Sequence, residues 1–294
     1  MQLWKKLGRV YCPSGKNILF KTHAYQPTPI VLNDRIRIYF SSFDYKSMGR
    51  IRYIDVDKHN PTNYTYIHKS IIVDIGESGT FDCNGVSPSC IFYKDDKYYL
   101  YYFGWQRTES VPFMLYTGLA TSSDGVNFEK YSRVPILDRI DKERFIRDAS
   151  FVINYQDGYL MYYVTSPIKW GNYCVYYLES DSLYKWTGGG KVAIPLRNGE
   201  FGIGRPCVLF DNNIYKMWYG YRGHEFNYDI GYAESKDGKL WKRMDDEIEF
   251  TKGRTLWDST MKCMPYVVKV DNDYYMFYNG DGIGRTGFGC AKLY

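Results

Sequence analysis

Apolar and aromatic positions alternate along this chain in short runs that a few polar turn residues separate. In residues 88–102 and again in 206–219, an apolar run is followed by a turn and then by a run rich in tyrosine or tryptophan. Such alternation is typical of half-buried β-strands joined as hairpins. One aromatic position of this pattern recurs, and subtracting residue numbers gives spacings of 62, 61, 56 and 59: Tyr39, Tyr101, Tyr162, Trp218 and Phe277. A period of this length predicts a repeat architecture.

Each repeat also carries a second signal, a strand followed by Ser-x-Asp-Gly-x-x-aromatic or a relative of it. It occurs at 119–128, 179–186 and 233–241, with Asp124-Gly125 and Asp237-Gly238 as the turns. Asp-Gly between two alternating runs is a hairpin signal, because glycine tolerates positive φ and aspartate caps its own backbone. Each repeat therefore supplies four short antiparallel strands. This predicts an all-β fold, a five-bladed β-propeller of four-stranded blades that occupies residues 1–294 as a single domain.

The two ends of the chain indicate how the ring closes. The last repeat ends at Tyr294, where its third strand should finish and its fourth is missing. Residues 3–6, Leu-Trp-Lys-Lys, resemble the fourth strands at 240–243 and 128–131. We expect the N-terminal strand to complete the last blade, which removes an exposed sheet edge. The alternative is an unpaired N-terminal tail.

Composition fits this prediction. Aromatic residues make up 19% of the chain, 32 of them tyrosine, and no segment keeps a helical period. Tyrosine suits half-buried strands, with its hydroxyl at the rim, so most of these rings should pack between blades. No stretch is long and apolar enough to span a bilayer, and the start lacks a signal-peptide core. We therefore expect a cytoplasmic protein without a membrane partner, and the oligomeric state stays open.

Cysteine and charge exclude some functions. The seven cysteines are scattered and form no Cys-x-x-Cys pair, so they read as small buried residues of a reducing compartment, and no metal site is expected. The net charge of +5 is spread along the chain without a basic run, which gives little reason to expect nucleic acid. No nucleotide-binding loop, nucleophile elbow or metalloprotease motif is present, and we expect no cofactor.

The topology of a propeller predicts where polar residues converge. Residues just before each innermost strand reach the central axis, and the loops after each second strand rim the same pocket. Aligned through the repeat, the axial position holds Gln26, Ser87, Asp148, Arg205 and Met264. The rim loops supply Trp105, Arg107, Glu109, Lys169, Trp170, Arg222, His224, Glu225, Asp281 and Arg285. Charged groups and tryptophans in one funnel suit a carbohydrate substrate, whose hydroxyls need polar partners and whose apolar face stacks on indole.

At these residues the chain resembles the superfamily of five-bladed propeller glycosidases, which includes arabinanases, xylosidases, invertases, levansucrases and mannoside phosphorylases. The resemblance covers the whole length as architecture. Its most specific match is Arg147-Asp148-Ala-Ser, similar to the Arg-Asp-Pro element of those enzymes. In that superfamily an axial aspartate of the first blade acts as base or nucleophile, a second aspartate orients the substrate, and a glutamate is the acid. By resemblance, Asp148 takes the orienting role.

The chain departs from that pattern at two positions. Gln26 precedes the first-blade proline, where the resemblance calls for an aspartate, and Arg205 precedes the proline of the fourth blade. Glutamine cannot act as a base and arginine cannot act as an acid. The usual triad is therefore absent from its usual places.

A glycosidase still needs two carboxyl groups, roughly 5 Å apart for retention or roughly 6.5–9.5 Å apart for inversion. Phe81-Asp82 and Trp257-Asp258 stand alike ahead of their blade prolines, which predicts that both carboxylates point into the channel. We expect the catalytic groups among these two and Asp148, with a buried glutamate as proton donor. The candidates are Asp82, Asp148, Asp258, Glu200 and Glu225. For each, the competing interpretation is a loop cap or an ion pair with a neighbouring arginine.

The candidate binding residues include an unusually cationic set. They are His23, Gln26, Asn84, Trp105, Arg147, Trp170, Arg205, Arg222, His224 and Lys262. Arginine forks match acidic sugars and phosphate, although pairing with nearby aspartates would neutralise the same charges. The leading hypothesis is a glycoside hydrolase that uses a carboxylate acid/base mechanism in the central funnel. The alternatives are a glycoside phosphorylase or glycosyltransferase that uses the cationic ring, and a carbohydrate-binding propeller without catalysis.

Overall fold

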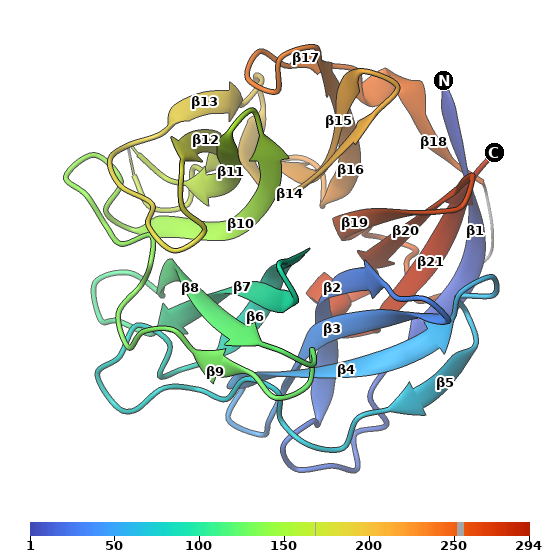
Figure 1. The fold of residues 1–294 in the computed structure, drawn as a ribbon, viewed down its shortest axis with the longest axis horizontal. Coiled ribbons are helices and arrows are strands. Elements are labelled where there is room, and N and C mark those ends of the chain that lie inside the picture. Colours follow the sequence, from blue (N-terminus) through green and yellow to red (C-terminus); the bar gives the residue numbers. More distant parts are fainter. Residues whose placement is uncertain (168, 252–255) are drawn as a thin grey trace.

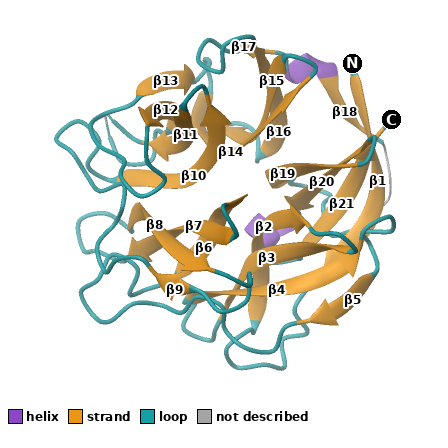
Figure 2. Ribbon diagram, viewed as in Figure 1, coloured by secondary structure: helices purple, strands orange, loops and turns teal. Residues whose placement is uncertain are grey.

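The computed structural model describes residues 1–167, 169–251 and 256–294, and it is built almost entirely of strands. Figure 1 shows the strands arranged around a common centre, in chain order, and Figure 2 shows how little of the chain is helical. Within the described residues, hydrogen bonding divides the strands into four sheets of four, eight, four and five strands. The prediction of an all-β fold is confirmed.

Two of the sheets are simple antiparallel meanders. One contains β2 (Thr22–Val31), β3 (Arg35–Phe43), β4 (Gly49–Asp57) and β5 (Tyr64–Ile67). The other contains β14 (Glu200–Asp211), β15 (Ile214–Gly223), β16 (Asp229–Ser235) and β17 (Lys242–Arg243).

The eight-stranded sheet consists of two further meanders. The first has β6 (Val86–Lys94), β7 (Lys97–Gln106), β8 (Met114–Ser122) and β9 (Glu129–Lys130). The second has β10 (Ile146–Tyr155), β11 (Gly158–Thr165), β12 (Cys174–Ser180) and β13 (Lys191–Ile194). A short parallel pairing of β8 with β10, between Leu115 and Ile146 and between Tyr116 and Arg147, joins the two.

The last sheet unites the two ends of the chain. It contains β18 (Ile248–Phe250), β1 (Gln2–Tyr11), β21 (Phe288–Leu293), β20 (Asp273–Asn279) and β19 (Cys263–Val270) in that order. β1 runs antiparallel to β21, so the predicted pairing of the N-terminal strand is confirmed (Figure 1). Trp4 on β1 is fully buried, with its ring edge against Trp218. Two short helical turns complete the elements, η1 (Asp245–Glu247) and α1 (Asp281–Gly284).

Each strand nearest the centre contains a bulge at the same place. The strand register shifts there, and the backbone takes positive φ at Gln26, Ala149, Arg205 and Met264. Phe151 pairs with Tyr162 as Thr28 pairs with Tyr39, and Ala149 and Gln26 each lie two residues before the first member of the pair. Ala149 is therefore the equivalent of Gln26. Asp148 therefore stands one position earlier than the sequence alignment placed it, at the level of Tyr25, Gly204 and Cys263. Counted in the same way, Pro88 and not Ser87 is the equivalent of Gln26, although in β6 Pro88 is paired with Tyr102 and the residue left unpaired is Ser89.

The interior consists of aromatic and aliphatic clusters, a large one and a smaller separate one, as the composition predicts. All seven cysteines lie in the described part of the chain and are free thiols, four of them buried. None of the described helices is long and apolar enough to cross a membrane.

Candidate functional site

Two adjoining cavities open at the centre of the ring and share part of their walls. The outer cavity has a volume of about 410 Å³ and the inner one about 220 Å³. Both are lined by the side chains Tyr25, Phe113, Leu115 and Ile283. Strands β2, β10, β14 and β19 supply residues of the inner cavity, and the β7–β8 and β11–β12 loops cover it. We call the two cavities together the funnel.

Asp148 lies in the wall of the inner cavity. It comes from β10 just before the bulge, and 8% of the residue is exposed. Among the described residues, no other residue pairs with its carboxylate through a hydrogen bond or an ion pair. Burial therefore raises the pKa of Asp148 to about 7, while its own backbone amide opposes the shift. Asp148 is also the single carboxylate among the described residues that line the funnel.

Three tyrosines stand around Asp148 in the same cavity. The Gln26 side-chain amide donates a hydrogen bond of 3.0 Å to the Tyr25 hydroxyl, and the hydroxyls of Tyr173 and Tyr228 are hydrogen-bonded to each other. Burial raises the pKa of Tyr25 and of Tyr173, and the charge of Asp148 adds to both shifts. These hydroxyls stay protonated, so they can donate hydrogen bonds to a ligand. The buried Oε1 of Gln26 has no partner within the described residues.

Two arginines, Arg205 and Arg222, give the inner cavity its positive charge. The Arg222 guanidinium stacks on the rings of Phe201, Tyr228 and Tyr173, at 4.6, 4.8 and 5.3 Å from their centroids. It forms no ion pair with any residue the structure describes. Stacking leaves the N–H edge of a guanidinium available for an anion.

Arg205 plays a different part, because it bridges strands across the centre. Its guanidinium donates to the carbonyl oxygens of Pro88, Ser89 and Pro27 and to the Thr28 hydroxyl. Those partners lie on β2 and β6. One buried side chain of β14 therefore forms hydrogen bonds to strands of two other sheets. Burial lowers the pKa of Arg205, and no carboxylate within the described residues pairs with it. The charge therefore remains under the funnel.

Aromatic rings form the outer wall. Trp105 lies against Phe43 and Phe103, at 5.8 and 6.1 Å between ring centroids. Trp170 meets the edge of Phe113 and donates its indole N–H to the carbonyl oxygen of that residue at 2.9 Å. The position of both tryptophans in the funnel agrees with the sequence prediction.

His23 also lies in the outer cavity, stacked on Phe43 with the ring centroids 4.5 Å apart. Burial and the nearby Arg285 charge lower the pKa of His23 to about 4. The ring is therefore neutral at physiological pH. It suits hydrogen bonding better than proton donation.

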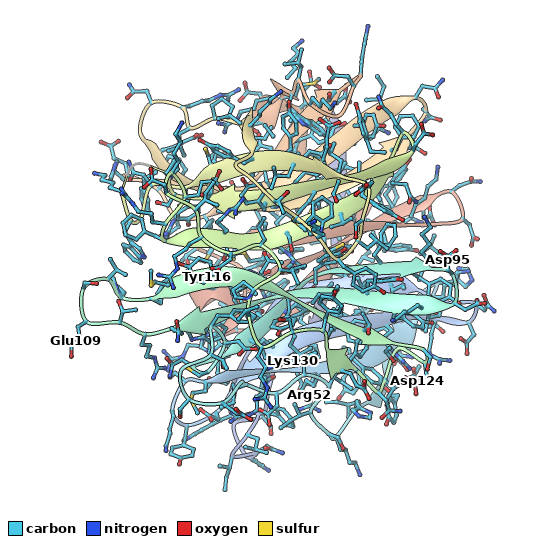
Figure 3. All side chains as sticks on the ribbon, turned by 60° about the vertical axis from the view of Figure 1, so that its left-hand side comes forward. Arg52, Asp95, Glu109, Tyr116, Asp124 and Lys130 are labelled. Atoms are coloured by element: carbon cyan, nitrogen blue, oxygen red, sulfur yellow. The ribbon has the colours of Figure 1, made fainter. Side chains whose placement is uncertain are left out.

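Three predicted catalytic carboxylates do not reach the funnel. Asp82 pairs with Lys130 at 2.6 Å, Asp258 with Lys6 at 2.8 Å, and Glu200 with Arg243 at 2.7 Å. Each cation comes from the fourth strand counted from the centre of its sheet, β9, β1 or β17 (Figures 1 and 3, where Lys130 is labelled). The prediction that these carboxylates point into the channel is wrong, because side chains on this face of each sheet turn toward its outer strand.

These ion pairs repeat around the ring, each with a buried tyrosine. The Tyr102 hydroxyl donates to Asp82 at 3.1 Å, and that of Tyr278 donates to Asp258 at 2.8 Å. Arg147 belongs to the same set, since it pairs with Glu143 at 2.8 Å beside Tyr163, and not to a substrate site. Tyr102, Tyr163, Tyr219 and Tyr278 follow the 62-, 61-, 56- and 59-residue period from Phe40. We call these the carboxylate–tyrosine–cation clusters.

The other predicted residues lie outside the described lining of the funnel. Glu225 and His224 are exposed in the β15–β16 loop. Asn84 accepts the backbone N–H of Arg107 at 2.8 Å, and so holds a loop in place. Lys262 pairs with Asp229 at 3.0 Å. In the structure these four have local partners or face solvent, so a role in substrate binding is not supported by their position.

Of the fifteen predicted site residues, the funnel brings together His23, Gln26, Trp105, Asp148, Trp170, Arg205 and Arg222. Sequence reasoning missed Tyr25, Phe43, Phe103, Phe113, Tyr173, Tyr228 and Ile283. The tyrosines carried no separable signal, because they look like the many tyrosines of the core. Ile283 did carry a signal, because it stands between two glycines. It lies in α1 (Asp281–Gly284), where its backbone is left-handed at φ 56°. No group of three or more metal-ligating side chains occurs within the described residues.

Comparison with known proteins places the chain beside two mycobacterial sequences. It is 34% identical to Uncharacterized protein MT1551 of Mycobacterium tuberculosis, over 99% of each chain, and 33% identical to Uncharacterized protein Rv1502 of the same species, also over 99% of each. No family model matches the chain.

Among solved structures the similarity is one of fold. A glycoside hydrolase superposes with a TM-score of 0.75 at 17% identity, over 98% of this chain and 90% of that one. A glycosyl hydrolase from Bacteroides ovatus gives 0.73 at 17% identity, over 98% and 89%. A protein from the work on mannoside phosphorylases and glycoside hydrolases that target β-1,2 mannosidic linkages gives 0.72 at 14%, over 98% and 89%. The fold is therefore that of propeller-type glycoside hydrolases and phosphorylases.

Proposed function

Since the chain belongs to the same family as the Mycobacterium tuberculosis proteins MT1551 and Rv1502, and its fold is that of sugar-acting enzymes, we propose that it transfers a glycosyl group to phosphate. We also propose that the eight-stranded sheet counts as two blades, which would give a ring of five. The proposed activity is that of a glycoside phosphorylase. A glycosyltransferase that uses an acceptor hydroxyl in place of phosphate is the nearest variant of the same reaction.

One observation carries the proposal: Asp148 is the single carboxylate among the described residues that line the funnel. Hydrolysis by the usual route needs a second carboxylate, either as nucleophile or to activate water. Phosphate is itself a nucleophile and removes that need. The glycoside hydrolase that the sequence favoured is therefore the weaker candidate, because its other carboxylates lie in ion pairs outside the funnel.

The mechanism assigns Asp148 the role of general acid. With a pKa of about 7, a large fraction of its carboxyl groups holds a proton at neutral pH. As the bond between C1 of the sugar and the leaving oxygen breaks, Asp148 gives its proton to that oxygen, and a phosphate oxygen forms the new bond to C1. The products are a sugar 1-phosphate and a free hydroxyl. Asp148 then takes a proton back from solvent.

Arg222 and the tyrosines supply the phosphate subsite in this proposal. A stacked guanidinium without an ion pair can present two N–H groups to phosphate oxygens, and buried hydroxyls can donate beside it. The buried Arg205 adds positive charge below. Trp105 and Trp170 are placed for stacking on sugar rings, and the free Oε1 of Gln26 can accept a sugar hydroxyl.

The test uses the reaction in the synthetic direction. A panel of sugar 1-phosphates is mixed with reducing monosaccharides, and released phosphate is measured for the wild-type protein and for Asp148→Asn. Release that needs both sugars and fails in Asp148→Asn supports the proposal. Release of free sugar from glycosides in phosphate-free buffer, at the same rate as with phosphate, would show hydrolysis instead.

A further inference from the structure

A patch beside the mouth of the funnel combines exposed apolar side chains with unpaired lysines. It is formed by the β1–β2 loop and the β3–β4 turn, whose side chains line one shallow hollow. Ile18, Tyr45 and Leu19 are 69%, 62% and 42% exposed. We call this the lysine-rich patch, and its members are Lys16, Ile18, Leu19, Lys21, Tyr45 and Lys46.

The loop presents these side chains in a fixed arrangement. The Asn17 carboxamide oxygen accepts the backbone N–H groups of Leu19 and Phe20, at 2.9 and 3.1 Å. The buried Phe20 ring then anchors the turn beneath the Arg52 guanidinium, 4.2 Å from the ring centroid. Because Phe20 points inward, its neighbours Ile18 and Leu19 are held outward. Their exposure follows from a hydrogen-bonded turn.

The charge of the patch has one sign. None of Lys16, Lys21 and Lys46 takes part in an ion pair with a described residue, and residues 12–21 contain no acidic side chain. Asp44, at the base of the turn, is buried and bonded to Arg50 at 2.7 Å. Three lysines without an ion pair to a described residue therefore lie among three exposed apolar side chains, and the Lys46 ammonium is 5.5 Å from the centroid of the Tyr45 ring.

The patch adjoins the funnel. Arg107, which lines the outer cavity, donates hydrogen bonds to the backbone carbonyls of Lys46 and Ser47, at 3.0 and 3.2 Å, and Ser47 lines that cavity too. Arg107 belongs to the same loop as Glu109, which projects on one side of the molecule in Figure 3, opposite Asp95 and Asp124. The patch and the funnel mouth therefore lie side by side.

From this arrangement we infer that the lysine-rich patch docks on the surface of a membrane that contains anionic phospholipid. Lysines near such a surface are attracted to it, and exposed aliphatic and tyrosine side chains enter the headgroup region. Six residues are few for a protein partner, since specific protein interfaces use about 20–30 residues a side. This is a surface contact and requires no membrane-spanning segment.

Docking in this way would turn the funnel mouth toward sugars attached to lipid. That consequence rests on the proposed function, and it names a substrate class: glycans carried on a lipid at the membrane surface. The docking itself does not depend on catalysis. The two can therefore fail separately.

The experiment is co-sedimentation with vesicles of phosphatidylcholine, alone or mixed with phosphatidylglycerol, at low and high salt. We expect the wild-type protein to bind only the mixed vesicles, and to bind them less at high salt. Lys16→Glu with Lys21→Glu should lower the apparent binding constant by about tenfold or more, and Ile18→Asp should weaken binding as well.

The matched control is Lys236→Glu with Leu240→Asp. These exposed residues flank the Asp237 turn, which is the repeat equivalent of the Asp124 turn on the opposite side (Figure 3). The counterpart of this control on the patch, with the same change in charge, is Lys16→Glu with Ile18→Asp. The control variant should bind like wild type, and thermal melting shows whether each variant is folded. The inference would be overturned if the wild-type protein failed to bind mixed vesicles, or if the control variant lost as much binding as the patch variants. A protein would then be the better candidate for a partner of this patch. No sugar is present, so the result is separate from that of the phosphate-release assay.

Discussion

The Tyr102 hydroxyl donates a hydrogen bond to the Asp82 carboxylate at 3.1 Å, inside a sheet and outside the funnel. Lys130 completes this cluster at 2.6 Å. Because Oδ2 accepts from both of these groups and Oδ1 accepts from the Thr80 hydroxyl at 2.9 Å, we assign Asp82 a stabilising role and not a catalytic one.

Replacement of Asp82 by asparagine should therefore lower stability and spare activity. Removing one partner of a buried ion pair leaves an uncompensated charge, here that of Lys130, and costs roughly 3 kcal/mol. Urea denaturation measures the loss, and turnover per folded molecule should stay near wild type. Lys130→Met in the Asp82→Asn background should cost less than the sum of the single changes. A selective loss of turnover at unchanged stability would return Asp82 to the active site.

Asp148→Asn should show the opposite behaviour. Loss of the general acid should reduce turnover by about a hundredfold or more. The variant should also be more stable than wild type at pH 8, since its neutral amide avoids the burial of a charge. Melting temperatures of the two proteins, measured alongside their rates, test both parts. A carbohydrate-binding protein without catalysis would instead show weaker sugar binding and no turnover in either form.

The stability of the wild-type protein should depend on pH through the same group. The pKa of Asp148 is raised from 3.8 to about 7 in the folded state, so between these values the native protein binds more protons than the unfolded chain. Its contribution is therefore complete below about pH 4, is lost as pH rises through 7, and amounts to at most about 4 kcal/mol. The difference in unfolding free energy between wild type and Asp148→Asn, followed from pH 4 to pH 8, should change in that direction. A difference that stays constant with pH would mean that burial does not raise the pKa of the Asp148 carboxyl.

Activity should follow the same titration. If Asp148 must be protonated to act as the acid, kcat/KM falls as pH rises above about 7. His23, with its pKa lowered to about 4, should not contribute a limb near neutrality, so His23→Gln should leave this profile in place. Loss of the alkaline limb in His23→Gln would assign the proton to the histidine.

Arg222→Lys should weaken phosphate binding more than it changes the rate at saturation. Lysine keeps the charge and loses both the two-pronged donor edge and the stacking on Tyr228. We expect KM for phosphate to rise by about tenfold, since a charge-assisted hydrogen bond contributes about 1.5 kcal/mol or more. Initial rates at varied phosphate, with sugar saturating, measure this. An unchanged KM for phosphate would remove Arg222 from the subsite.

The fold was largely predictable because its signals are repeated along the sequence. The 62-, 61-, 56- and 59-residue period, the Asp-Gly turns and the resemblance of residues 3–6 to other outer strands are all found by comparing segments of the sequence with one another. The pairing of β1 with β21 follows from them. The parallel pairing of β8 with β10 left no comparable signal.

The site was harder to predict because it depends on which way a side chain turns. Phe81-Asp82 and Trp257-Asp258 share a sequence pattern, and their aspartates occupy equivalent positions in the structure. At both positions the carboxylate forms an ion pair with a lysine of an outer strand and does not enter the funnel. Asp148 was found by its resemblance, yet its position at the bulge was misjudged by one residue, because the third repeat has Ala149-Ser150 where others have a proline. One residue of register decides which side chain enters the funnel.

The decisive measurement compares glycoside cleavage by the wild-type protein and by Asp148→Asn in the presence and absence of inorganic phosphate. We expect cleavage by the wild-type protein to rise with phosphate and to yield sugar 1-phosphate, and the variant to lose about a hundredfold or more of this activity. Cleavage that ignores phosphate, or that survives in Asp148→Asn, would contradict the proposed function.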